Sequence, residues 1–184
     1  MATDLTGLKV RINLAVEATA KKAYGIGIPE AKIDISKAVS LAFGQTALQA
    51  DQIWSDRRTI AADGTDAIDL VGDAGMKNPF GGAISFTNIK AIVVINRSDQ
   101  TTTDPAHTAT DAKISVGGAA AAEFLGPFNA AGDAIDVVCG SPFVAINPAA
   151  NGWAIAEGSD ILQIKNEDGV DEALYDIMVI GEAA

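Results

Sequence analysis

Short runs of alternating apolar and polar residues recur along this 184-residue chain, and turn residues separate them. In the first run, residues 8–16, apolar residues take every second position and Lys9 and Arg11 stand between them. This period of two is typical of a β-strand with one buried and one solvated face. We therefore expect a strand over 8–16. A helix over 13–24 is the alternative, because good helix formers there precede Gly25.

The next runs predict further strands. Alternation continues over residues 31–43, with Lys37 as a kink or as the junction of two short strands. Residues 51–72 predict a hairpin around the Asp63-Gly64 turn.

Residues 83–98 are apolar on both faces in their middle, which predicts a central strand covered from both sides.

In the second half, residues 112–118 predict a short strand with Ile114 and Val116 facing inward, and residues 119–128 one helical turn. Further strands are expected at 134–139, 143–146, 152–156 with 160–166, and 173–181. Nine or ten short strands without a βαβ rhythm predict an all-β fold. We expect an antiparallel β-sandwich, jelly-roll-like, with residues 1–30 as an N-terminal arm or first strand and residues 31–184 as the sandwich domain.

Charge is distributed unevenly. Residues 1–58 carry eight basic and six acidic side chains, whereas residues 59–184 carry five and eighteen, and the whole chain has a net charge of −11. An acidic surface repels phosphates, so we expect no nucleic-acid partner. The longest strongly apolar run, 91–95, is far shorter than a membrane span needs, and no signal peptide is expected.

The chain offers little for catalysis. Its only histidine, His107, lies in a polar loop where we expect it to be solvated, and no G-x-S-x-G motif is present. The single Cys139 excludes an internal disulfide and is interpreted as a small buried residue on a strand. We therefore expect a non-enzymatic protein with no catalytic residue.

Metal and cofactor signals are equally weak. The spacing of histidine and cysteine excludes a typical zinc site, and the oxygen-rich residues 165–172 lack the spacing of a calcium loop. We interpret them as a solvated hairpin turn and expect no metal and no cofactor. Trp54 and Trp153 are interpreted as packing residues, with sugar stacking as the alternative.

The runs "ADQIWSDRRTIAADGTDAIDLVG", "ISFTNIKAIVVINRS", "GWAIAEGSDILQIKNEDG" and "YDIMVIG" resemble those of small virion proteins of tailed bacteriophages. The resemblance covers most of residues 31–181. It implies a jelly-roll decoration (cement) protein that binds the major capsid protein, forms homo-oligomers such as trimers, and resides on the capsid surface after synthesis in the host cytoplasm. The alternative is a carbohydrate- or receptor-binding module of a head fibre or tail.

Within that resemblance, the basic residues near the N-terminus are candidates for partner binding. Lys9, Arg11, Lys21 and Lys22 are expected to face the capsid lattice or a neighbouring copy. The alternative is that they are ordinary solvated cations, which contribute about 0–1 kcal/mol per exposed pair.

Overall fold

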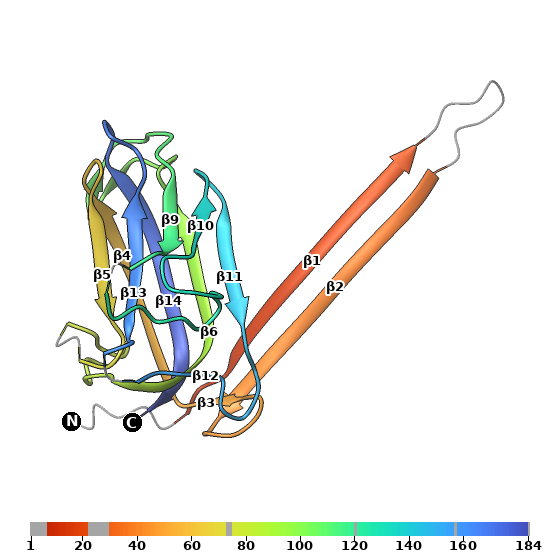
Figure 1. Cartoon of the computed structure of the whole chain (residues 1–184). Coiled ribbons are helices and arrows are strands. Elements are labelled where there is room, and N and C mark those ends of the chain that lie inside the picture. The colour runs from red at the N-terminus through yellow and green to blue at the C-terminus, as the bar shows by residue number, and fades with distance from the viewer. Residues whose placement is uncertain (1–6, 22–29, 73–74, 120, 157, 184) are drawn as a thin grey trace.

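A computed structural model describes residues 7–21, 30–72, 75–119, 121–156 and 158–183, and the side chains of 16–21 and 30–34 lie outside this description. Within these ranges the chain forms fourteen strands and no helix (Figure 1). No helix long and apolar enough to cross a membrane is present among them. The predicted all-β fold is confirmed.

Two antiparallel sheets form a β-sandwich (Figure 1). The four-stranded sheet has the order β10 (Ala134–Val137), β9 (Ile114–Gly117), β13 (Ile161–Asn166), β5 (Thr65–Asp69). The five-stranded sheet has the order β11 (Pro142–Ile146), β6 (Phe86–Asn96), β14 (Ala173–Ala183), β4 (Gln52–Ile60), and β12 (Trp153–Ala154) pairs with β6. A small ladder joins β7 (Thr102–Thr103) to β8 (Ala106–His107).

The main hydrophobic core lies between the two sheets. On β9 and β13 every second residue points into it, and Ile114, Val116, Leu162 and Ile164 are fully buried. The inward orientation predicted for Ile114 and Val116 is confirmed. Burial of such side chains supplies the main driving force for folding, about 1.5–3 kcal/mol for each one.

The hairpin predicted over residues 51–72 is wrong, although its turn is correct. Gly64 N–H donates to the carbonyl of Ala61 at 2.8 Å, and Asp63 has a positive φ of 55°. The chain reverses there, but β4 pairs with β14 and β5 pairs with β13, in different sheets. Turn chemistry specifies a change of direction, whereas the partner of each strand is decided by the packing of the whole sandwich.

The helical turn predicted within 119–128 is also wrong for the described residues of that segment. Ala122 takes a positive φ of 56°, and its carbonyl accepts the N–H groups of Asp160 and Ile161. The Glu123 carboxylate accepts the N–H groups of Gly118 and Gly132. These long-range hydrogen bonds replace the local ones that a helix would use.

Strands β1 (Val10–Lys21) and β2 (Glu30–Phe43) form a long antiparallel hairpin that projects from one end of the sandwich (Figure 1). The predicted strand over 8–16 is confirmed, and the helix alternative is wrong because β1 continues to Lys21. The junction of two short strands considered at Lys37 is wrong, since β2 continues through that position and its register with β1 is unbroken there. The hairpin thus spans both sides of the domain boundary expected at residue 30, and β3 (Gln49–Ala50) joins the end of β2 in parallel.

A buried ion pair lies at the same end of the sandwich as the hairpin. Lys90 is 0% exposed, and its Nζ lies 2.9 Å from Oε1 of Glu182 on β14. The same ammonium donates to the carbonyls of Ala149 and Ala150, and Glu182 Oε2 accepts from Asn88. These contacts tie β6, β14 and the loop after β11 together.

Lys90→Met is expected to lower the free energy of unfolding by about 3–5 kcal/mol, because it leaves Glu182 buried without its cation. The double variant Lys90→Met/Glu182→Gln removes both charges and is expected to recover much of that loss. Denaturant unfolding of the two single variants and the double variant measures the coupling. If the double variant lost as much stability as the two single variants together, the two residues would not be coupled and the prediction would be contradicted.

Candidate interaction surfaces

The β1–β2 hairpin has one apolar and one polar face. Residues directly opposite each other in an antiparallel pair share a face, so the register groups them into rows. One face carries aliphatic residues and a single lysine, in the rows Val10–Leu41, Ile12–Val39 and Leu14–Lys37, followed by Ile35. We call these seven residues the apolar stripe.

The base of the apolar stripe packs against the sandwich. The rows Val10–Leu41 and Ile12–Val39 belong to a second hydrophobic cluster, separate from the main core. Their partners on the outer face of the five-stranded sheet are the row Ile53, Ile180, Ala91 and Ile146. Leu41, Ala91 and Ile180 are at most 1% exposed.

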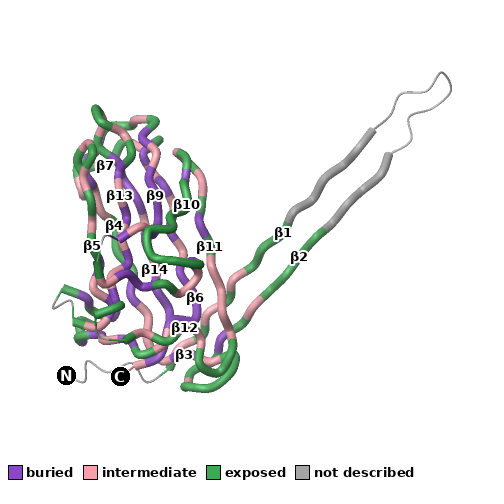
Figure 2. Tube along the Cα trace, in the orientation of Figure 1, coloured by how far each residue is buried: buried purple, intermediate pink, exposed green. Residues whose placement is uncertain are grey.

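Beyond the base, the same stripe is uncovered. Leu14 is 63% exposed and Ile35 is 67% exposed. Figure 2 shows exposed stretches on both β1 and β2 past the base of the hairpin. The apolar face predicted to be buried along residues 8–16 is therefore buried near the body and exposed at Leu14. The hairpin is longer than the surface on which it packs. The alternation of apolar and polar residues could not predict how much of the hairpin is covered.

The structure describes three of the four basic residues predicted to bind a partner, and these three lie at the two ends of β1. Lys9 precedes β1 and Arg11 lies on the polar face, where its Nε donates to Oδ1 of Asn13; both are exposed near the body. Lys21 is the last residue of β1, opposite Glu30, about 33 Å further along the strand. Lys22 lies outside the described residues. Their expected role stays a prediction.

Next to the hairpin base, the outer face of the five-stranded sheet continues as two further rows: Ser55, Met178, Val93 and Val144, then Arg57, Asp176, Ile95 and Pro142. We call these eight residues the open sheet face. Val144 is 44% exposed there. Much of this face, with Asp56, Asp104 and Ile177, lines a shallow hollow of about 620 Å³. The sequence prediction of a strand covered on both sides is thus correct for the part of β6 under the hairpin base and wrong for Val93 and Ile95.

Asp176 holds the charged part of the open sheet face together. Its carboxylate accepts hydrogen bonds from Arg57 at 2.5 and 3.0 Å and from Arg97 at 3.0 Å. The bond from Arg57, followed by that from Arg97, lowers the pKa of Asp176, and the same contact raises the pKa of Arg57. The sequence reasoning did not single out these residues, which lie far apart in the chain.

The two residues considered for catalysis, His107 and Cys139, are both at least half-buried. His107 is buried, not solvated as predicted, and its Nδ1 lies 3.1 Å from Glu172 while Nε2 lies 3.3 Å from the carbonyl of Ser98. Cys139 is half-buried just beyond β10, and burial raises its thiol pKa. A raised pKa disfavours the reactive thiolate.

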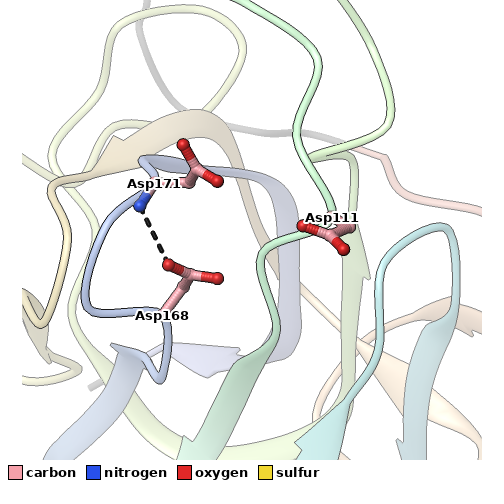
Figure 3. Close-up of side chains that lie close together, drawn as sticks. All are labelled: Asp111, Asp168 and Asp171. Atoms are coloured by element: carbon pink, nitrogen blue, oxygen red, sulfur yellow. Dashed lines mark hydrogen bonds between the residues drawn. The ribbon is translucent and has the colours of Figure 1, made fainter.

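The oxygen-rich turn at 165–172 contributes to an acidic cluster. The carboxylates of Asp111, Asp168 and Asp171 have oxygens within 4.8 Å of one another (Figure 3). Asp168 accepts the N–H groups of Asp171 and Val170, which lowers its pKa. The predicted turn is present, but it leads from β13 in one sheet to β14 in the other and is not a hairpin. Its hydrogen bonds give Asp168 a role in shaping the loop.

Neither tryptophan forms an exposed platform for a sugar. Trp54 is 3% exposed, and the guanidinium of Arg58 lies 5.1 Å from its ring centroid. Trp153 is half-buried and packs against the main core. Both positions agree with the packing roles predicted for them.

Comparison with protein-family models, curated proteins and solved structures found no match for this chain. Its architecture is an antiparallel β-sandwich that carries a long hairpin with a partly uncovered apolar stripe.

Acidification is expected to destabilise the protein in part through Asp176. Its pKa is lower in the folded state than the value of about 3.9 in an unfolded chain, so its contribution is present above pH 4 and is lost as pH falls through the folded pKa. Asp176→Asn is expected to show a shallower loss of stability below about pH 4. Unfolding curves recorded from neutral to acidic pH measure this, and parallel pH profiles for the two proteins would contradict it.

Proposed function

We propose that this protein is a non-enzymatic structural component of a tailed-phage virion, most simply a decoration protein that coats the capsid. The strand and turn patterns of residues 31–181 support this proposal by their resemblance to virion proteins. The observation that carries it is the hairpin, whose exposed Leu14 and Ile35 extend an apolar surface beyond the body. Exposed aliphatic side chains in such an array mark a contact with another macromolecule.

The strand order supports the finer proposal of a jelly roll. Taken in chain order, the eight main sandwich strands are β4, β5, β6, β9, β10, β11, β13 and β14. If these strands are numbered 1 to 8 in that order, the five-stranded sheet without β12 has the order 6-3-8-1 and the four-stranded sheet has the order 5-4-7-2. All pairs are antiparallel, and only the connection from β9 to β10 stays within one sheet. Two interleaved Greek keys of eight strands define the jelly roll, a fold common in viral capsid proteins.

The charge distribution fits a protein that covers a shell. Most acidic residues lie after residue 58, in the sandwich, and a net charge of −11 keeps crowded copies soluble. In this proposal the hairpin provides the contacts with the major capsid protein and with other copies. Arg11 on its polar face and Lys9 just before β1 are exposed for pairing with acidic groups. The protein then resides on the capsid surface and needs no reactive pocket.

A shortened hairpin tests this function. Replacing residues 14–37 by Asn-Gly joins Asn13 to its register partner Ala38 through a favoured two-residue turn and retains the packed base. We expect the variant to fold and to lose binding to capsids of the encoding phage that lack this protein. Co-sedimentation with such capsids measures the binding, and the melting temperature controls for folding.

Two outcomes would contradict the proposal. One is a wild-type protein that does not sediment with these capsids and is absent from intact particles. The other is a shortened variant that coats capsids as well as wild type, because the hairpin would then not be needed for capsid binding.

A further inference from the structure

One copy carries two uncovered surfaces of matching chemistry. The first is the distal part of the apolar stripe, with Leu14, Ile35 and Lys37. The second is the open sheet face, where Val93, Val144 and Ile95 are half-buried or exposed and Met178 packs against the cluster at the hairpin base. Both are direct continuations of surfaces that already contact each other inside the chain, at the hairpin base.

The internal contact shows how the two surfaces pack. At the base, two rows of the stripe lie on the aliphatic row that contains Ala91 and Ile180. The next row of the sheet, with Val93 and Val144, presents the same kind of side chain. An aliphatic hairpin face can therefore pack on this second row in the same way as on the first. Within one copy, no hairpin lies above the second row.

Each of the two surfaces also carries charged residues. The distal stripe carries one cation, Lys37, which is exposed. The hollow over the open sheet face is lined by Asp56, Asp104, Asp176 and Arg57. Asp56 is paired with Arg58, and Asp176 is paired with Arg57 and Arg97. The charges of the open sheet face are thus largely paired with one another, and the aliphatic rows carry the match between the two surfaces.

The two surfaces cannot meet within one copy, because the hairpin runs away from the sandwich beyond its base (Figures 1 and 2). We infer that the distal stripe of one copy packs on the open sheet face of a second copy. Such a contact is heterologous: each chain offers a hairpin to one neighbour and a sheet face to another, so that a suitable rotation closes a ring. The inference deepens the proposed function, on which it rests, by assigning the contact between copies.

Sedimentation of purified protein without capsids tests the contact. Leu14→Glu/Ile35→Glu places charges on the distal stripe and is expected to weaken self-association at least tenfold. Asn13→Glu/Ser36→Glu is the matched control, because it puts the same diagonal pair of charges on exposed positions of the opposite hairpin face and is expected to associate like wild type. All four positions are exposed, so melting temperatures should stay close to that of wild type.

A mixing experiment distinguishes the inferred contact from one between two hairpins. Val144→Lys places a charge on the open sheet face at an exposed edge-strand position. Alone, this variant and Leu14→Glu/Ile35→Glu are each expected to be monomeric. Mixed one to one, they should form a heterodimer, because the mixture contains one intact stripe and one intact sheet face.

Monomeric wild-type protein, an oligomer that survives Leu14→Glu/Ile35→Glu, or a mixture that stays monomeric would each overturn the inference. Capsid binding is scored separately. Protein that coats capsids but never associates in solution would support the proposed function and contradict the inference. Protein that associates through these surfaces but does not bind capsids would support the inferred contact and contradict the proposed function. If Leu14→Glu/Ile35→Glu loses capsid binding and keeps its oligomer, the stripe contacts the capsid protein and not a second copy.

Discussion

The hairpin depends on a small aliphatic contact at its base. A two-stranded hairpin is at best marginally stable alone in water, so β1 and β2 need support from the body. Leu41 supplies much of it by packing with Ala91 and Ile180 on the outer face of the five-stranded sheet, and the short parallel pairing of β2 with β3 fixes the direction in which the hairpin leaves. Loss of this contact would leave the sandwich core intact and the hairpin without an anchor.

The same contact divides the outer face of the sheet into two regions of different character. Under the hairpin base, β6 and β14 are covered on both faces, and the buried pair Lys90–Glu182 lies at that end of the molecule. Away from the base, the open sheet face has solvent on one side, and Asp176 with its two arginines replaces aliphatic packing. One continuous sheet thus provides both the region that anchors the hairpin and the open sheet face that is available for contacts.

Particular residues show where sequence reasoning ended. The turn at Asp63-Gly64 could be predicted, because only a few residue types favour its backbone conformation, but the partners of β4 and β5 could not. Lys37 was interpreted as an interruption, although an exposed hairpin face accommodates a lysine as easily as a leucine. The burial of His107 and Lys90 was not predicted either, since their partners Glu172 and Glu182 lie 65 and 92 residues away.

The sequence by itself determined the all-β character, most of the strand positions and the two-faced nature of the first strand, because alternation and turn residues act locally. Only the tertiary structure decided which strands share a sheet, how far the hairpin extends past the body, and which half of its apolar stripe is left uncovered. Those features depend on contacts between segments far apart in the chain, and a period of two is the same whether the face it creates meets a sheet, a second molecule or water.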